Sequence, residues 1–241
     1  MSLSDLEKER YFKQLSVRDW NQERLKSAKV LIVGIGGLGS ASALYFTAAG
    51  VGKLRLCDED KVERSNLNRQ VLYFEESIGK IKVEEAKKRL AALNPNVEIE
   101  AVSESIGSQN ADELTKGCDI IVDGLDSIES RFLLNEQSVK MQIPYVYGAV
   151  QGWQGYVSLF HPPHTACLAC ILPKEAQTPD TIPIPGVLPG VIGIIQATEA
   201  LKFIMGVEKT LAGSLLIYDS QHLTFDIVEI EKNPSCTYCA P

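Results

Sequence analysis

The chain has 241 residues, of which 45% are hydrophobic and 23% charged, so it is long enough for one domain with a substantial core. Its net charge of −7 argues against broad, non-specific binding to nucleic acid, which requires clustered cations. No apolar run is long enough to span a bilayer and residues 1–10 are too polar for a signal peptide, so we expect a cytoplasmic protein without membrane contact.

Signals for strands and helices alternate along the first two-thirds of the chain. The polar residues 4–24 are expected to form one or two short helices, and the apolar run Lys29–Val33 is typical of a strand covered on both faces. The further strands expected are 53–57, 97–102 and 119–122, and the helices are 40–49, 81–93, 111–116 and 128–140. This alternation predicts a mainly parallel sheet with right-handed crossovers.

The pattern changes after Pro144. Residues 145–160 are typical of one or two strands without a helix between them, and the proline-rich residues 162–189 are expected to form a long loop that is functional or mobile. A helix and two strands complete the chain, at 190–205, 215–218 and 223–230. The predicted fold class is α/β, a Rossmann-like, doubly wound and mostly parallel sheet extended by C-terminal antiparallel strands.

A glycine-rich turn follows the first strand directly. Gly34-x-Gly36-x-x-Gly39 stands between that strand and a helix, which is the context of dinucleotide-binding turns, where helical N–H groups face phosphate. Asp58 ends the next strand, where an acid commonly binds a ribose hydroxyl. The alternative is a glycine turn without a ligand, and the motif alone does not separate NAD from ATP.

A cluster of polar and charged residues favours ATP. Arg69 and Lys82 are placed to neutralise the charge that builds up as pyrophosphate leaves. Asp123 and Asp126 follow the strand at 119–122, and carboxylate oxygens suit Mg²⁺. Each cation alone is best explained as a solvated surface charge, but the group maps to one rim of one sheet. A dehydrogenase would instead need a proton donor, often histidine.

Four of the six cysteines form two pairs. Cys167-x-x-Cys170 and Cys236-x-x-Cys239 predict a tetrahedral, structural Zn²⁺ site, with a disulfide or a redox pair as the alternatives. The nearby His161 and His164 are interpreted as loop residues and the lone Cys57 and Cys118 as small buried apolar residues. We therefore treat the chain as one domain with three parts: an N-terminal helical segment (1–28), a nucleotide-binding core (29–160), and a crossover loop, helix, strands and zinc-binding tail (161–241).

The order of these motifs resembles that of the E1-like adenylyltransferases of the MoeB, ThiF and HesA type, over residues 10–239. The resemblance implies a homodimer with one ATP site per subunit. It also implies that ATP is used to adenylate the C-terminal glycine of a ubiquitin-like sulfur-carrier protein ending in Gly-Gly. The implied cofactors are ATP, Mg²⁺ and Zn²⁺.

The resemblance also implies roles for individual residues. Arg69 and Lys82 would be catalytic through the phosphates, and Asp126 would be catalytic by binding magnesium. Asp58 and its neighbours would hold the ribose. The nucleotide-binding residues expected in full are Gly37, Asp58, Asp60, Ser65, Asn66, Arg69, Gln70, Lys82, Asp126 and Ser127.

Three departures from the family pattern affect the function. Lys13 stands where relatives often have an arginine that reaches the partner subunit's ATP site, and it lacks the planar fork of arginine. Ser127 stands where many relatives have asparagine. The loop Pro173–Gly186 has no cysteine, which predicts adenylation without a persulfide or thioester on this chain. The alternative functions are a non-catalytic ATP-binding dimeric scaffold and an NAD-dependent oxidoreductase.

Overall fold

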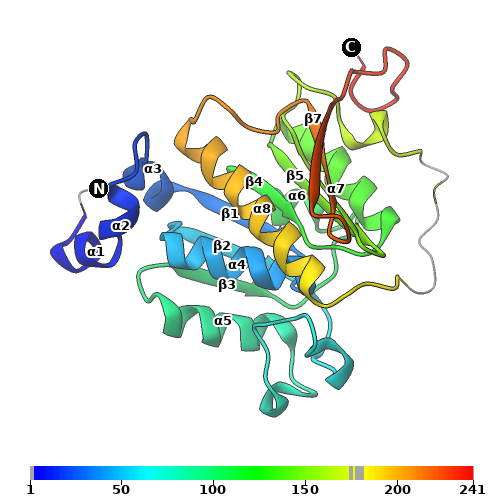
Figure 1. Cartoon of the computed structure of the whole chain (residues 1–241). Coiled ribbons are helices and arrows are strands. Elements are labelled where there is room, and N and C mark those ends of the chain that lie inside the picture. Colours follow the sequence, from blue (N-terminus) through cyan, green and yellow to red (C-terminus); the bar gives the residue numbers. More distant parts are fainter. Residues whose placement is uncertain (1–2, 174–175, 177–181, 241) are drawn as a thin grey trace.

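The computed structural model describes residues 3–173, 176 and 182–240, which build one mixed sheet of eight strands (Figure 1). The strands are β1 (Lys29–Val33), β2 (Lys53–Cys57), β3 (Glu98–Val102), β4 (Ile120–Asp123), β5 (Tyr145–Gln151), β6 (Gln154–Phe160), β7 (Ser214–Asp219) and β8 (Thr224–Glu229). Their order is β3-β2-β1-β4-β5-β6-β7-β8, parallel from β3 to β5 and antiparallel from there to β8. The sheet confirms the predicted fold class.

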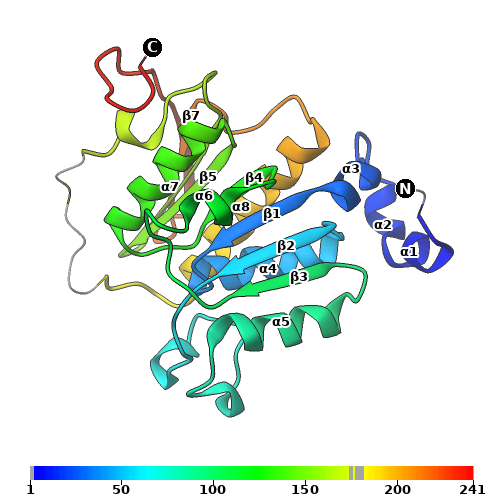
Figure 2. The ribbon, with the colours of Figure 1, turned by 180° about the vertical axis from the view of Figure 1, so that it is seen from behind.

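Helices cover both faces of this sheet. The α-helices of the described residues are α1 (Asp5–Arg10), α2 (Phe12–Leu15), α3 (Gln22–Ser27), α4 (Gly37–Ala49), α5 (Lys82–Leu93), α6 (Ala111–Thr115), α7 (Ile128–Met141) and α8 (Val187–Met205), of which α4 to α8 cover the sheet. Helices α4, α5 and α8 lie on the face seen in Figure 1, and α6 and α7 lie on the face seen in Figure 2. This two-sided cover is the doubly wound arrangement.

Strand β1 has four consecutive apolar residues, Val30 to Val33, because both of its faces are covered. Val30 and Ile32 belong to the hydrophobic cluster on the side of α4 and α8, whereas Leu31 and Val33 belong to the cluster on the opposite side. All four side chains are buried. Because successive side chains of a strand point to opposite faces, the part of a strand that is covered on both faces needs apolar residues at consecutive positions.

Helix α8 contradicts the expectation that no apolar segment of the chain is long enough to span a bilayer. Its 19 residues are long and apolar enough to cross a membrane, and it is the one such helix in the described part of the chain. The helix packs along α4 and over β5 and β6 (Figure 1). The two helices α4 and α8 approach closely at Gly193, where a Cβ atom would lie only 2.3 Å from the Leu38 carbonyl oxygen. Contact with α4 along one side and with the sheet along another accounts for the apolar sequence of this helix.

The N-terminal helices attach at the far end of α4. The Asn94 amide donates to the Tyr11 hydroxyl at 2.9 Å, and the Gln14 amide donates to the Ala49 carbonyl at 2.9 Å. Gly50 closes α4 with a φ of 81°, where a side chain would collide with the Tyr11 ring. These contacts fix α1 and α2 beside the C-terminal end of α4, opposite to its glycine-rich start.

Candidate functional site

A cavity of about 850 Å³ lies at the carboxyl ends of β1, β2 and β4. The strand order changes direction beside β1, and doubly wound sheets bind ligands at such a point. The volume falls in the usual range for small-molecule sites. Eight of the ten predicted nucleotide-binding residues line the cavity, namely Gly37, Asp58, Asp60, Arg69, Gln70, Lys82, Asp126 and Ser127.

The glycine turn forms the floor of this cavity. Helix α4 begins at Gly37, three residues earlier than the expected start, and its first turn faces the cavity. A side chain at Gly34, which has a φ of 85°, would lie 2.6 Å from the Gly124 carbonyl. A side chain at Gly39 would lie 1.9 Å from the Gly34 carbonyl oxygen. Glycine is therefore required for the loops after β1 and β4 to touch, which leaves the helix N-terminus open to an anion.

Asp58 is held in a fixed orientation at the end of β2. Its carboxylate accepts hydrogen bonds from the backbone N–H of Ile35 at 2.7 Å and of Asp60 at 2.9 Å. Burial raises the pKa of Asp58, and the positive charge of Lys82 acts in the opposite direction. A carboxylate fixed at this point is oriented to accept hydrogen bonds from a ribose, and that contact stays a prediction.

The two predicted cations lie at the cavity with different partners. The buried Lys82 ammonium lies 2.7 Å from an Asp60 carboxylate oxygen and 3.9 Å from Asp58. The Arg69 guanidinium donates to the Ser65 carbonyl at 2.9 Å and to the Asn68 side chain at 3.0 Å. Both cations can turn toward a phosphate chain, but Lys82 must first exchange its carboxylate partner for phosphate oxygens.

Ser65 and Asn66 do not line the cavity. The Asn66 side chain accepts a hydrogen bond from the Glu63 backbone at 3.0 Å, and the Ser65 hydroxyl donates to the Glu63 carboxylate at 3.2 Å. Both residues stabilise the short 3₁₀ helix Arg64–Asn66, which leads into Arg69. In this structure they shape the loop, and their direct contact with nucleotide stays a prediction.

Asp123 is not available for a metal ion, in contrast to the expectation that either Asp123 or Asp126 could serve. It is fully buried, lies 3.2 Å from the Arg131 Nε in an ion pair, and accepts a hydrogen bond from the Tyr145 hydroxyl at 2.7 Å. The same pair holds the peptide of Leu125: its N–H donates to Asp123 at 2.9 Å and its carbonyl accepts from Arg131 at 2.6 Å. The pair therefore fixes the loop that presents the exposed Asp126.

Several cavity residues carry no motif and were missed from the sequence. Glu104, Ser105 and Ile106 line the cavity after β3, and Arg131 lines it from α7. Ile182–Ile184 and Pro189 close its other side. Within the predicted proline-rich loop, residues 174, 175 and 177–181 lie outside the described residues. Only the general rule that ligands bind at strand ends could have indicated these positions.

The four paired cysteines form a second site, between the segment after β6 and the C-terminal tail. Their sulfur atoms all lie within 4.8 Å of one another, with 3.7 Å between Cys167 and Cys236 and 3.4 Å between Cys170 and Cys239. Tetrahedral Zn–S bonds of ~2.3 Å place sulfurs about 3.8 Å apart, whereas a disulfide requires about 2 Å. The thiolates thus fit a zinc ion with a closed coordination shell, and the disulfide alternative is excluded in this structure.

The lone cysteines and the histidines take the places expected of them. Cys57 and Cys118 are buried in the core. The His161 ring packs edge-on against Phe203 at 4.8 Å between centroids and beside His164 at 4.7 Å. Among the described residues, the one cluster of potential metal ligands contains cysteines alone. The two histidines are therefore packing residues of the loop.

Replacing one cysteine of this cluster is expected to remove the metal. Cys236→Ser should lose most of its zinc, and its Tm should fall by about 6–12 °C, which corresponds to about 3 kcal/mol for a chain of this size. Metal analysis and thermal unfolding of the purified variant measure both effects. Cys118→Ala is the matched control, because it removes a buried thiol away from the cluster and should keep its zinc. Full zinc content in Cys236→Ser would contradict the assignment.

Comparison with known proteins agrees with this geometry. The model of the ThiF family matches residues 10–238. The chain is 41% identical to the sulfur carrier protein adenylyltransferase of Thermus thermophilus, over 97% of this chain and 91% of that protein. It is 38% identical to the SAMP-activating enzyme E1 of Haloferax volcanii, over 99% and 91%. The crystal structure of E. coli MccB with ATP superposes with a TM-score of 0.80 at 25% identity, over 90% of this chain and 68% of MccB. Because the family model spans nearly the whole chain, the protein is a member of the ThiF family.

Proposed function

We propose that this protein binds ATP in the cavity and transfers AMP to the C-terminal glycine carboxylate of a small ubiquitin-like sulfur-carrier protein. The observation that carries the proposal is the meeting of the glycine turn, Arg69, Lys82 and Asp126 around one cavity. The adenylyltransferase names of the relatives, and MccB solved with ATP, support the same reaction. A dehydrogenase would not need this combination of two cations and an exposed acid at the phosphate end.

The reaction needs positioning and charge neutralisation. An oxygen of the carrier carboxylate attacks the α-phosphorus of ATP, and the bond to the bridging oxygen breaks, so that pyrophosphate leaves with the electron pair. The N–H groups at the start of α4 bind phosphate oxygens, and Asp58 holds the ribose. Arg69 and Lys82 neutralise the charge that develops on the leaving pyrophosphate, and their effect is strongest in the transition state.

Asp126 is the residue that would hold Mg²⁺. Its exposed carboxylate lies at the cavity, and one carboxylate together with phosphate oxygens and water is the usual ligand set of this ion. When bound, Mg²⁺ neutralises phosphate charge and orients the leaving group. Ser127, beside it, caps α7 by accepting a hydrogen bond from the Ser130 N–H at 3.4 Å.

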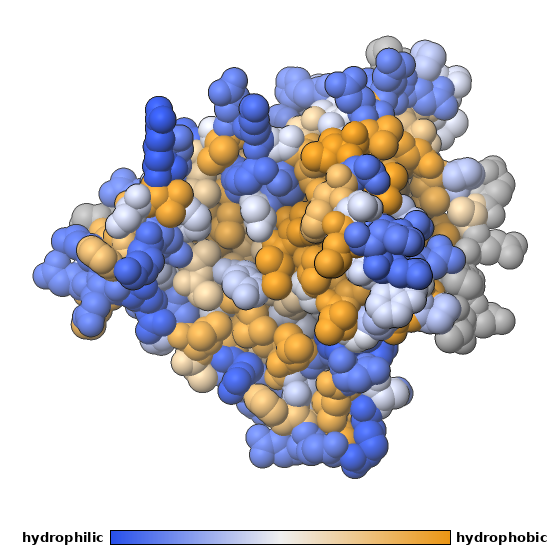
Figure 3. All heavy atoms as spheres, in the orientation of Figure 1, coloured by the Kyte–Doolittle hydropathy of each residue, from blue (hydrophilic) through white to orange (hydrophobic). Residues whose placement is uncertain are grey.

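The far edge of the sheet is the surface we assign to the carrier. Every residue of β8 is exposed, including the apolar Phe225, Ile227 and Val228. Figure 3 shows apolar side chains gathered over this end of the sheet and the neighbouring α8. An edge strand offers backbone donors and acceptors to another sheet, and the apolar side chains add area for a folded partner. The carrier's extended tail would then enter the cavity from this side.

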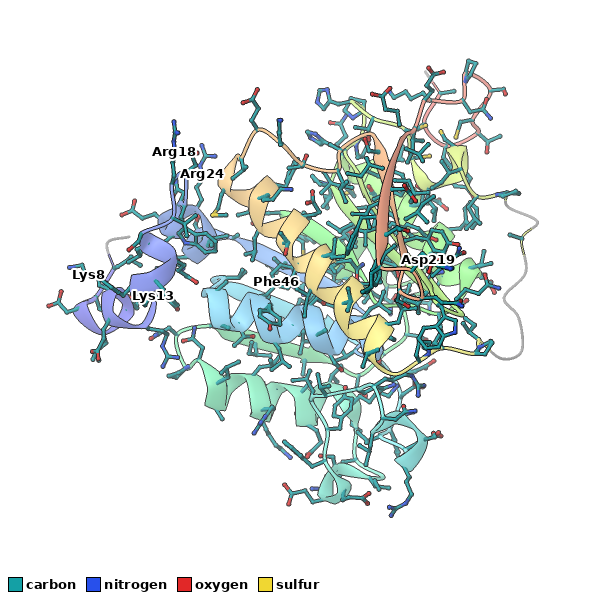
Figure 4. All side chains as sticks on the ribbon, in the orientation of Figure 1. Lys8, Lys13, Arg18, Arg24, Phe46 and Asp219 are labelled. Atoms are coloured by element: carbon teal, nitrogen blue, oxygen red, sulfur yellow. The ribbon has the colours of Figure 1, made fainter. Side chains whose placement is uncertain are left out.

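We also propose that the active form is a homodimer in which Lys13 serves the partner's site. Lys13 belongs to α2, beside the C-terminal end of α4 (Figure 4). Helix α4 has 13 residues and so spans about 20 Å, which separates Lys13 from the cavity of its own chain. A cation at that distance contributes to catalysis only across a subunit interface.

A mixed dimer tests this arrangement. Lys13→Ala is expected to lower adenylation about tenfold, because it removes one charge-assisted contact to phosphate, and Lys82→Ala should lower it further. A heterodimer of the two variants, isolated with two affinity tags, should recover one intact site, since the Lys82→Ala subunit supplies its Lys13 to the partner. Adenylation is measured per dimer. No recovery in the heterodimer would contradict action across the interface.

The experiment for the reaction itself uses intact carriers. The protein is incubated with Mg-ATP and purified carriers that end in Gly-Gly, and carrier mass and ATP–pyrophosphate exchange are recorded. We expect an AMP adduct and carrier-dependent exchange, both absent for a carrier without its last glycine and strongly reduced for Lys82→Ala. ATP binding without adduct or exchange for any carrier would overturn the enzymatic proposal and favour a nucleotide-binding scaffold.

A further inference from the structure

The peptide group of Ile35 is held on both sides inside the glycine turn. Ile35 stands between Gly34 and Gly36 and is fully buried. Its N–H donates to the Asp58 carboxylate at 2.7 Å, and its carbonyl accepts a hydrogen bond from the Tyr73 hydroxyl at 2.8 Å. The Ser40 hydroxyl approaches the same carbonyl at the longer distance of 3.3 Å. The glycine turn is thus fixed by side chains from two other segments.

Tyr73 comes from the same loop as Arg69, the cation proposed to bind phosphate. The Tyr73 N–H donates to the Gln70 carbonyl at 3.2 Å, and the Gln70 N–H donates to the Asn66 carbonyl at 2.9 Å. The loop is therefore tightly folded on itself, and its Arg69 has a defined position relative to the Tyr73 ring. The hydroxyl of Tyr73 then ties this folded loop to the glycine turn.

The environment of Tyr73 keeps its hydroxyl protonated. The side chain is 5% exposed, and burial together with the nearby Asp58 and Asp60 raises its pKa well above the ordinary value. A neutral phenol donates a hydrogen bond to a carbonyl, whereas a phenolate cannot. Tyr73 does not line the cavity, so it acts on the nucleotide site from behind.

We propose that Tyr73 is a positioning residue, which holds the glycine turn and the Arg69 loop in one relative position so that both meet the phosphates of ATP. The inference rests on the proposed function of the cavity. If Tyr73 has this role, the two parts of the nucleotide should respond differently to its loss. The phosphates depend on the geometry between the two loops, while the nucleoside depends on Asp58 and the residues after β3.

Tyr73→Phe is the sharpest variant, because it keeps the ring and removes one hydroxyl. We expect the Kd of ATP, measured by calorimetry, to rise about three- to tenfold, the range for one lost hydrogen bond. The Kd of adenosine should stay within about twofold of wild type, because adenosine has no phosphate. Amide hydrogen exchange over residues 34–40 should become faster even without ligand, because the Ile35 carbonyl has lost its shorter bond.

Ser138→Ala is the matched control. The buried Ser138 hydroxyl also donates to a main-chain carbonyl, that of Ile143 at 2.6 Å, at the end of α7 away from the cavity. This variant should lose a similar amount of Tm and leave both Kd values and exchange over residues 34–40 unchanged. Equal weakening of adenosine and ATP by Tyr73→Phe, or unchanged exchange in the turn, would overturn the positioning role. Wild-type protein that binds no ATP would instead overturn the proposed function, and the exchange measurement would still decide the role of Tyr73 in the turn.

Discussion

Asp126→Asn is expected to lower the rate of carrier adenylation by about 100-fold or more, because it removes the carboxylate that would hold the magnesium of Mg-ATP. Asparagine has almost the same shape, so the loop between β4 and α7 should keep its conformation. The loss should appear in ATP–pyrophosphate exchange at saturating carrier. Raising the Mg²⁺ concentration should recover part of the rate, since the variant still offers one oxygen ligand.

Glu129→Gln is the control for Asp126→Asn. Glu129 is an exposed acid in the first turn of α7, three positions further along, and it does not line the cavity. The substitution removes the same charge from the same region, so a general field effect would lower the rate in both variants. We expect Glu129→Gln to keep nearly full activity. Similar losses in the two variants would contradict a specific role for Asp126.

The second large effect concerns stability. Arg131→Leu leaves the carboxylate of Asp123 buried without a cation, and breaking a buried ion pair in this way typically costs about 3–5 kcal/mol. The free energy of unfolding, measured with urea at one fixed protein concentration, should fall by that amount. The Leu125 peptide also loses its carbonyl partner, so the loop that carries Asp126 should lose order before the rest of the fold.

A double variant separates the unpaired charge from lost packing. In Asp123→Asn combined with Arg131→Leu, both charges are gone, and the amide oxygen can still accept from Tyr145 and Leu125. We expect it to recover about 1–3 kcal/mol relative to Arg131→Leu alone. The single variant Asp123→Asn completes the comparison. If the double variant loses as much free energy of unfolding as the two single variants together, the two charges do not interact.

The strands were predictable because buried strands have short segments of apolar residues that can be recognised in the sequence. The limits expected for β1 and β2 agree with the structure, since each strand begins with a lysine and has buried apolar residues, and Gly34 and Asp58 follow directly. The start of α4 was placed three residues late, because Gly37-Leu38-Gly39 has low helix propensity and tertiary contacts decide its conformation. Likewise α8 begins at Val187, before a proline that is tolerated in the first turn of a helix.

The candidate site was only partly predictable from the sequence. Residues within motifs, such as Asp58 and Lys82, lie at the cavity because strand ends collect at one edge of a parallel sheet. The contrast between Asp123 and Asp126 was not predictable, because both follow one strand and only the position of Arg131 decides which acid is buried. Tyr73 was missed for a similar reason, since its contact joins two loops that are distant in sequence.

The cysteine cluster changes how the C-terminal third of the chain can come apart. With zinc bound, Cys170 and Cys236 are joined through the metal, so the chain between them forms a closed loop that contains α8, β7 and β8. A protease that cuts the chain between α8 and β7 would open this loop, but the zinc ion would still hold the two fragments together. The fragment that contains β7 and β8 could leave only after both peptide hydrolysis and removal of the zinc ion.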